Sequence, residues 1–318
     1  MISLKRLEDV ELTAYEDSFL IGDLLTNRAT ILSGEPKSGK TLLAAGMVIA
    51  LLNGEDTFLD LPIFRQAHHV VFGLTDDGAE EELKARLHDA VPPGSVSVFS
   101  IREPGEPDYW VTVRDKLAES GADLFVLDNM LGSLKAGEDI ANSVTGQGIV
   151  TILRILTGSG VPVLAITHTP KGNSEGLSVS SSVIGGRAIA AGARGVATLR
   201  NSQKQGRRLA TAMNRGHQEL DIRVSVERRS PDSEVPVWSR AIAPAAESKK
   251  RNRAGDDAVN MGRLADYLVA EQPADAGSFR AVAEKHAQQF RVSKNKAQRG
   301  LKNFAHLDGG KWIAGAKP

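Results

Sequence analysis

The chain contains no cysteine among its 318 residues. This absence excludes disulfides, iron–sulfur clusters, thiol nucleophiles and zinc sites with cysteine ligands. The longest apolar run, residues 42–52, falls well short of the roughly 20 residues that a membrane-spanning helix needs. The N-terminus, MISLKRLEDVEL, is too charged for a signal peptide. We therefore expect a cytoplasmic protein that does not bind a membrane.

An excess of charge of one sign is also missing, because 39 Lys and Arg residues balance 39 Asp and Glu residues. This balance argues against a protein that is basic throughout. It does not exclude a local basic patch, because acidic residues elsewhere in the chain can offset its charge. Aromatic residues make up only 5% of the chain. A hydrophobic content of 41% is ordinary for a globular protein, and the length predicts about two domains.

Short apolar runs alternate with helical patterns in the first half of the chain. Strands are predicted at 30–34, 68–75, 96–101, 123–128 and 161–168, and helices at 40–52, 78–91, 108–120 and 149–160. This alternation predicts an α/β fold, a mostly parallel sheet with helices on both faces. Further strands are predicted at 195–200, 208–215 and 221–229, as antiparallel additions at one edge of the sheet.

The C-terminal part has a different composition. We predict an ATPase core at 1–243, a basic linker at 244–255 and a small domain at 256–318. Three helices (256–272, 278–290 and 293–307) and an extended tail (309–314) predict a winged helix-turn-helix-like unit. Residues 249–318 hold 14 Lys or Arg residues and 7 Asp or Glu residues. Lys296 and Arg299 would form a DNA-binding face; the alternatives are a solvated helix face or a protein-docking module.

The segment GEPKSGKT, residues 34–41, matches the phosphate-binding loop pattern G-x-x-x-x-G-K-[ST] between a predicted strand and helix. We expect the loop to bind ATP and Mg²⁺. Lys40 would reach the β- and γ-phosphates, and the Thr41 hydroxyl would bind magnesium. The predicted nucleotide-binding residues follow the motif: Gly34, Glu35, Pro36, Lys37, Ser38, Gly39, Lys40, Thr41 and Leu42.

Polar residues end three of the predicted strands, where parallel sheets form their ligand crevice. Asp128 would bind magnesium, directly or through water, although a turn aspartate is the alternative. Asp76 would orient and deprotonate the attacking water, while Asp77 is predicted to cap the next helix. His168 would contact the γ-phosphate; a structural histidine is about as plausible.

Several segments together resemble one family. FLIGDLLTNRATILSGEPKSGKTLLA is similar to the opening of RecA-fold ATPases of the plasmid RepA and DnaB-type replicative helicase group. VVFGLTDDGAEEELKARL, LDNM, LAITHTPKG and SSVIGGRAIAAGARGVATLR resemble its later motifs. The likeness covers roughly residues 18–227. It implies a RecA-like fold and an ATP-driven ring, expected to be hexameric, that acts on single-stranded DNA in the replication of a plasmid, phage or other mobile element.

Two positions depart from the family pattern. Asp76 stands where the family has a catalytic glutamate, one methylene longer. A late Lys-x-Arg-x-Gly segment, which reaches the neighbouring subunit's site in the family, corresponds to Met213, Asn214, Arg215 and Gly216. Arg215 is thus the candidate arginine finger. Arg187 and Arg194 are weaker candidates, and ordinary surface arginines remain the alternative.

Two long loops, 129–147 and 169–186, are rich in Gly, Ser and Asn, and compact domains rarely keep such loops without a function. The resemblance implies that they line a channel for single-stranded DNA. Neither loop has an aromatic residue for base stacking, so Lys135, Lys171 and serine hydroxyls would bind phosphates. The alternative is a pair of nucleotide-dependent loops without DNA contact.

The sequence leaves three functions open. The favoured one is a helicase. The second is an ATP-dependent DNA-binding, loading or recombination-mediator protein that does not unwind. The third is a DNA-binding regulator whose oligomeric state is switched by ATP. Through its C-terminal domain such a protein could also contact duplex DNA or a replication partner.

Overall fold

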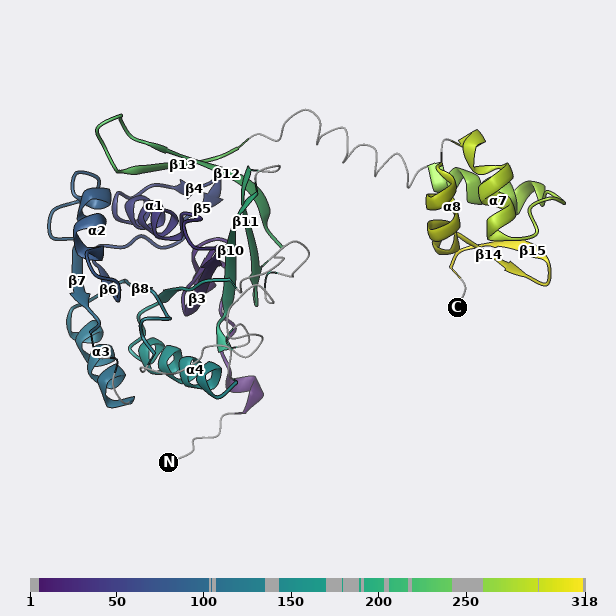
Figure 1. Ribbon diagram of the computed structural model, residues 1–318. Coiled ribbons are helices and arrows are strands. Elements are labelled where there is room, and N and C mark those ends of the chain that lie inside the picture. The colour runs from purple at the N-terminus through teal and green to yellow at the C-terminus, as the bar shows by residue number, and fades with distance from the viewer. Residues whose placement is uncertain are drawn as a thin grey trace. The chain divides into compact units, whose positions relative to one another are not determined.

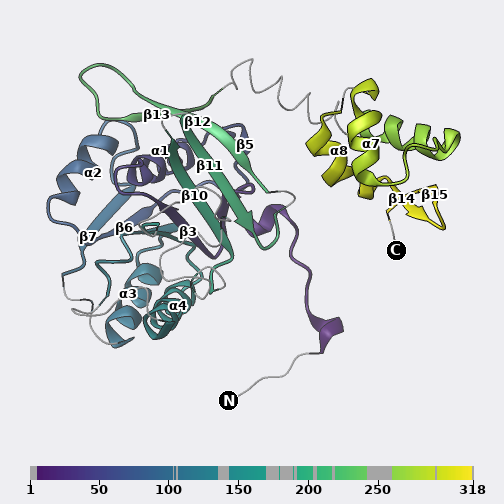
Figure 2. The same ribbon diagram turned by 45° about the vertical axis from the view of Figure 1, so that its right-hand side comes forward.

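A computed structural model of the chain describes residues 6–102, 104, 107–134, 143–169, 179, 189, 192–202, 206–216, 219–241, 260–290 and 292–316 (Figures 1 and 2). The chain divides into two compact units, Met1–Ala241 and Ile242–Pro318. Each unit has apolar cores of its own. Among the described residues, no helix combines the length and the apolar character that crossing a membrane requires.

The first unit is built on a nine-stranded sheet with the order β13-β12-β11-β10-β3-β9-β8-β6-β7. In chain order the strands are β3 (Ala29–Gly34), β6 (Val70–Leu74), β7 (Val96–Ser100), β8 (Leu124–Asp128), β9 (Val163–Ile166), β10 (Gly195–Ser202), β11 (Gly206–Met213), β12 (Asp221–Arg228) and β13 (Pro236–Arg240). Two short antiparallel pairs lie outside this sheet: β1 (Phe19–Ile21) with β2 (Leu25–Thr26), and β4 (Thr57–Phe58) with β5 (Leu61–Pro62).

The strands from β10 to β7 are mutually parallel, and β11, β12 and β13 continue the sheet in antiparallel fashion. The predicted mostly parallel sheet is confirmed. The prediction that residues 195–200 form an antiparallel addition is wrong, because β10 pairs in parallel with β3, Val196 opposite Ile31. Two parallel strands need a long crossover connection, and the chain between Ile166, the end of β9, and Gly195, the start of β10, is long enough for one.

Helices cover both faces of the sheet, as predicted (Figure 1). α1 (Lys40–Leu52) and α2 (Ala79–Leu87) pack on one face, and α3 (Pro107–Glu119) and α4 (Ser143–Thr157) pack on the other. Alternate residues of β8 serve the two cores: Leu124 and Val126 face α1 and α2, while Phe125 and Leu127 face α3 and α4. This double burial explains the continuous apolar runs of the sequence. The result is a RecA-like α/β fold.

The predicted helix at 149–160 begins earlier and ends earlier than the sequence suggested. α4 spans Ser143–Thr157. Its first turns contain Gly146 and Gly148, whose low helix propensity hides the true start from sequence reasoning. The helix is held by the burial of Ile149, Leu153 and Leu156 against the sheet, so packing outweighs propensity.

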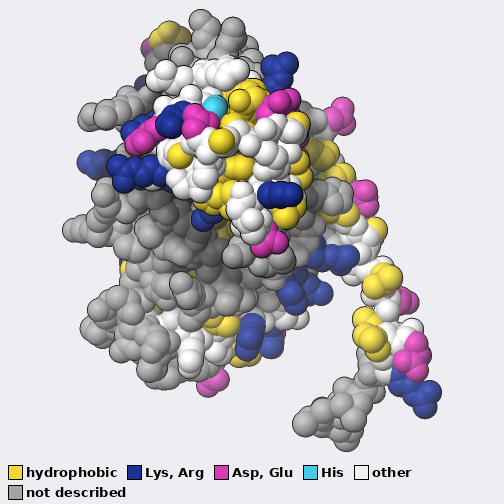
Figure 3. All heavy atoms as spheres, turned by 90° about the vertical axis from the view of Figure 1, so that its right-hand side faces the viewer, with side chains coloured by type: hydrophobic (Ala, Val, Ile, Leu, Met, Phe, Trp, Pro, Cys, Tyr) yellow, Lys and Arg dark blue, Asp and Glu magenta, His cyan; other side chains and the backbone are white. Residues whose placement is uncertain are grey.

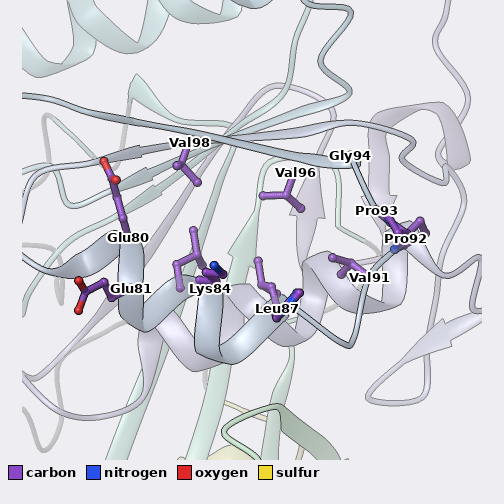
Figure 4. Close-up of a pocket in the computed structure, with 12 residues that line it drawn as sticks. Glu80, Glu81, Lys84, Leu87, Val91, Pro92, Pro93, Gly94, Val96 and Val98 are labelled. Carbon is purple, nitrogen blue, oxygen red and sulfur yellow. The ribbon is translucent and has the colours of Figure 1, made fainter.

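A groove of about 440 Å³ lies between α2 and β7, the strand at the free edge of the sheet (Figure 4). Its apolar walls are Leu83 and Leu87 from the helix and Val96 and Val98 from the strand, and Lys84 stands beside them. None of the residues predicted to carry chemistry lines this groove.

The second unit contains a helix at residues 260–271, α7 (Phe279–Lys285), α8 (Lys294–Gly300) and a hairpin of β14 (Ala305–Asp308) with β15 (Lys311–Ala314). The third helix was predicted to run from 293 to 307. This is wrong, because α8 ends at Gly300 and a single 3₁₀ turn, Leu301–Asn303, precedes the hairpin.

The turn of that hairpin explains the difference. Gly309 and Gly310 have φ values of 54° and 81°. A two-residue hairpin turn favours positive φ at both positions, which glycine adopts without strain. The turn pairs Leu307, the last residue of the predicted third helix, with Trp312 on β15. Trp312 is buried and donates its indole N–H to the Ala276 carbonyl at 2.8 Å. Three helices and a two-stranded hairpin are therefore present, and the winged-helix assignment itself stays a prediction.

Candidate nucleotide site

The phosphate-binding loop and the polar ends of three strands meet at one edge of the sheet, the edge formed by the carboxyl ends of the parallel strands. The loop leaves the end of β3, and β9, β8 and β6 follow it in the order of the sheet. Asp128 is the last residue of β8, Asp76 follows β6, and His168 follows β9. Because parallel strands end at the same edge, residues from distant parts of the chain come together there.

Glycine is required at both ends of the loop. A Cβ on Gly34 would lie 2.5 Å from the Leu199 carbonyl oxygen and 2.8 Å from Ser38 Oγ, so a larger residue would push the loop off β10. Gly39 caps α1 with φ of 101°, a left-handed conformation that favours glycine. The loop therefore turns directly into the N-terminus of α1, where backbone N–H groups favour an anion.

Lys40 reaches back over the loop. Its Nζ donates to the carbonyl oxygens of Gly34 at 3.1 Å and Glu35 at 2.9 Å, and it lies 3.3 Å from Nδ1 of His168. The side chain is buried, and this burial lowers the pKa of Lys40, while Asp128 acts in the opposite direction. The ammonium group is therefore held at the mouth of the loop, where a phosphate bound by the loop would meet it.

The other predicted loop residues differ in exposure. Glu35, Pro36 and Lys37 are exposed, whereas Thr41 and Leu42 are half-buried. Ser38 is buried, and its Oγ has no hydrogen-bond partner within the described residues. An unpartnered buried hydroxyl in a phosphate-binding loop fits a ligand that supplies the missing acceptor.

The two predicted magnesium ligands are in contact. Thr41 Oγ1 donates to Asp128 Oδ2 at 2.7 Å. Burial raises the pKa of Asp128, Asp76 raises it further, and the hydrogen bond from Thr41 lowers it. Within the described residues no group of three or more His, Cys, Asp or Glu side chains could bind a metal. A carboxylate and a hydroxyl beside a phosphate site match what Mg²⁺ needs when phosphates and water complete its shell.

Asp76 is exposed beside Asp128. Asn129 donates its side-chain N–H groups to the two Asp76 oxygens at 3.2 and 3.4 Å. The Thr75 hydroxyl donates to Asp76 Oδ1 at 3.3 Å. Sequence reasoning missed Asn129, although its place directly after Asp128 was a usable signal. These contacts hold the Asp76 carboxylate at the edge of the sheet, with its outer side open to solvent.

Asp77 does not cap α2, so that prediction is wrong. The N-cap is Gly78, in a left-handed conformation with φ of 75°, and no side chain accepts a hydrogen bond from the first turn. The backbone carbonyl of Asp76 takes the Ala79 N–H instead, at 3.3 Å. A left-handed residue between Asp77 and the helix replaces the extended N-cap geometry that a side-chain cap requires.

His168 lies against Lys40, as its predicted contact with the γ-phosphate would require. Burial lowers the pKa of His168 and the Lys40 charge lowers it further, while Asp76 raises it. The next residue fixes its position, because the Thr169 N–H donates to the Gly34 carbonyl at 3.1 Å. A neutral imidazole at the rim of the loop can therefore hydrogen-bond to a terminal phosphate.

Arg215 lies at the opposite edge of the sheet, the edge formed by the amino ends of the parallel strands. Met213, two residues before it, pairs with Gly195, which in turn pairs with Thr30 near the start of β3. The phosphate-binding loop follows the end of that strand. Six residues at about 3.3 Å each separate the two edges by about 20 Å, so Arg215 cannot reach the site of its own chain.

Two of the three candidate arginines, Arg194 and Arg215, lie at that second edge. Together with Arg28, which the sequence did not single out, they are exposed and line a pocket of about 270 Å³. Arg215 donates to the carbonyl of Thr13 at 2.6 Å. Among the described residues no carboxylate pairs with any of the three arginines. Such a pocket has unused guanidinium donors for an anion from outside the chain.

The predicted nucleic-acid residues are placed only in part. Lys135 and Lys171, and with them Arg187, lie outside the described residues, as does the side chain of Lys296. Arg299 is exposed in the last turn of α8. Lys294, on the same helix, pairs with Glu284 at 2.9 Å. On the face that Figure 3 shows, both positive and negative side chains are exposed.

The comparisons with known proteins agree with the site. A family model described as an AAA domain matches residues 14–174. The matched span contains the phosphate-binding loop, Asp76, Asp128 and His168, and it ends before Arg215. The search of curated proteins finds no match.

Proposed function

Because the chain belongs to the AAA domain family, whose members are P-loop ATPases, we propose that it couples ATP hydrolysis to movement along single-stranded DNA as a ring-forming replicative helicase. ATPase activity is the part that the family supports. The coupling to DNA and the ring are our extension of it.

The observation that carries the proposal is the separation of two complementary edges. One edge holds Lys40, Asp128 and Asp76 around a phosphate-binding loop. The other edge holds Arg215 in a pocket with two further arginines. An arginine that cannot reach its own site becomes useful when a second copy brings its site to that edge. A ring of identical subunits would satisfy this condition at every interface.

The residues of the site divide the chemistry. Lys40 neutralises the phosphates, and the half-buried Thr41–Asp128 pair would hold magnesium. Bound magnesium would offset the charge that develops on the phosphate oxygens. Asp76, exposed beside them, orients a water molecule and accepts its proton. His168, which lies beside Lys40, contacts the terminal phosphate. Arg215 stabilises the transition state in a neighbouring copy.

The first test is hydrolysis and strand displacement on a forked DNA duplex. Lys40→Ala removes the ammonium group at the mouth of the loop, so we expect ATP turnover and displacement to be abolished. Lys116→Ala is the matched control, because Lys116 is exposed on α3 and pairs only with Glu119 among the described residues. Wild-type turnover in Lys40→Ala would contradict the assignment of the loop.

The same assay separates the alternatives. ATP-dependent strand displacement supports the helicase. DNA-stimulated hydrolysis without displacement would instead support a loader or recombination mediator. Binding to duplex DNA that changes with the bound nucleotide would support an ATP-switched regulator.

We further propose that the C-terminal unit contacts DNA. Arg299 lies in the last turn of α8, Lys302 lies in the 3₁₀ turn that follows it, and Lys311 lies in the hairpin; all three are exposed. The unit has its own core, with Leu264, Val282 and Leu301 fully buried. Residues 250–318 alone should bind duplex DNA with an affinity that falls steeply as salt rises. Lys296→Glu with Arg299→Glu should weaken the binding; a folded fragment that binds no DNA at low salt would assign the unit to protein docking.

A further inference from the structure

Arg207, on β11, lies beside the phosphate-binding loop although no sequence motif points to it. Its Cζ, Nε and Nη2 atoms are each 3.8 Å from the position that a Cβ on Gly39 would occupy. A point equidistant from three atoms of a planar group lies over its face and not at its edge. The guanidinium group of Arg207 therefore turns one face toward Gly39, at van der Waals distance from a Cβ placed there.

Trp238, on β13, anchors this arrangement. The Arg207 Cζ lies 5.5 Å from the centroid of the Trp238 ring, a cation–π contact. The indole N–H donates to the Leu42 carbonyl of α1 at 2.9 Å. The ring also occupies the space left by Gly46, where a Cβ would come within 2.5 Å of the indole Cδ1. Arg207 is thus fixed, through Trp238, to the helix that begins at the loop.

The guanidinium lacks an acidic partner. Within the described residues, Arg207 Nε is buried without a hydrogen-bond partner, and no carboxylate pairs with the side chain. Burial lowers the pKa of Arg207. The next residue shows the contrast, because Arg208 donates to Asp221 at 3.0 and 2.9 Å. A half-buried cation without a counter-charge is costly unless a ligand supplies one, and here it stands next to an anion cradle.

We propose that Arg207 is a second cation of the nucleotide site, which binds the phosphate chain of the nucleotide held by the same chain's loop. The inference rests on the proposed nucleotide binding. One guanidinium face is turned toward Gly39 and the group packs on Trp238, so the N–H donors of its two terminal nitrogens, Nη1 and Nη2, are left for the ligand. Edge donors match phosphate oxygens, whereas stacking on a base would need a free face.

The test is calorimetric binding of ADP and of inorganic pyrophosphate to the full chain. A charge-assisted hydrogen bond corresponds to about 10–100-fold in affinity, so Arg207→Ala should raise both dissociation constants by that factor. Arg208→Ala, the matched control on the same strand, should change them less than about twofold. Arg207→Gln keeps the planar end of the side chain and removes its charge, so it should weaken binding by a similar factor. This variant provides the test if Arg207→Ala folds poorly.

The outcomes separate this inference from the function on which it rests. Unchanged dissociation constants in Arg207→Gln, with Lys40→Ala defective, would overturn the role of Arg207 alone. Weaker binding of ADP with unchanged binding of pyrophosphate would move the contact to the nucleoside and overturn the proposal as stated. A wild-type chain that binds neither compound would overturn the nucleotide site and this inference together. An equal loss for both compounds, at an unchanged unfolding midpoint of the free protein, supports it.

Discussion

At the scale of single residues, Asp76 and Asp77 are adjacent in the chain, yet only Asp76 is a candidate catalytic group. Asp76 accepts hydrogen bonds from Asn129 and Thr75 and raises the pKa of the half-buried Asp128. Asp77 is exposed and does not cap α2. Of the two, Asp76 is the one that neighbouring side chains hold beside the proposed magnesium site.

Asp76→Asn should therefore keep ATP binding and lose most hydrolysis. The amide retains an oxygen that can accept from Asn129, so the local structure survives, but it cannot accept the proton of the attacking water. General base catalysis contributes about 10²–10⁴-fold, which sets the expected loss in turnover. The measurement is single-turnover hydrolysis at saturating ATP, together with ATP affinity.

Asp77→Asn is the control and should turn over ATP at the wild-type rate. If Asp76→Asn instead loses ATP binding while turnover of the bound ATP stays normal, Asp76 acts on magnesium or on the fold. The one-methylene difference from glutamate adds a further check, because Asp76→Glu tests whether a longer side chain positions water better or worse.

At the scale of elements, the same substitution should have opposite effects in two helices. Gly46 in α1 faces Trp238, and a Cβ there would lie 2.5 Å from the indole Cδ1 and 3.3 Å from Phe58. Gly148 in α4 is exposed and has no atom within 4 Å of its Cβ position among the described contacts. Both helices would gain about 1 kcal/mol in propensity from alanine.

Gly46→Ala should lower the free energy of unfolding, because overpacking costs about 1–3 kcal/mol and exceeds the gain in propensity. Gly148→Ala should raise it by about 0.5–1 kcal/mol, since nothing opposes the gain. Urea unfolding of the two variants measures both effects. A stabilised Gly46→Ala variant would show that the indole moves aside, and would weaken the case for a rigid Trp238 beside Arg207.

At the scale of the whole molecule, the nucleotide edge and the arginine edge lie at opposite ends of β3. Arg215→Ala should bind ATP nearly normally and hydrolyse it poorly. An arginine supplied from a neighbouring subunit is worth about 10³–10⁵-fold in rate. The expectation depends on the proposed ring, because within one chain the strand keeps Arg215 away from the loop.

Mixing Arg215→Ala protein with Lys40→Ala protein tests this directly. Each parent lacks one half of every composite site, whereas a mixed interface can combine an intact loop with an intact arginine. Recovery of ATP turnover in the mixture would show action between subunits. No recovery, with subunit exchange demonstrated by an independent label, would assign Arg215 to holding Thr13 and the N-terminal segment in place.

The sequence by itself determined the parts of this protein that depend on local rules. The spacing of Gly34, Gly39, Lys40 and Thr41 defines a phosphate-binding loop because each residue meets a backbone or ligand requirement of the loop itself. Predicted helix 40–52 coincides with α1. Continuous apolar runs such as residues 124–127 are typical of a sheet buried on both faces, because every side chain of such a strand packs against apolar neighbours.

Tertiary structure alone decided what depends on residues far apart in the chain. The parallel pairing of β10 with β3, the contact of Asn129 with Asp76, and the end of α8 at Gly300 follow from strand order and hairpin pairing. Arg207 comes to lie beside Gly39 only because β11 and β13 fold back beside α1. The alternation of residues in a strand predicts on which face of the sheet a side chain lies. It does not predict which segment packs against that face, because the tertiary structure determines that neighbour.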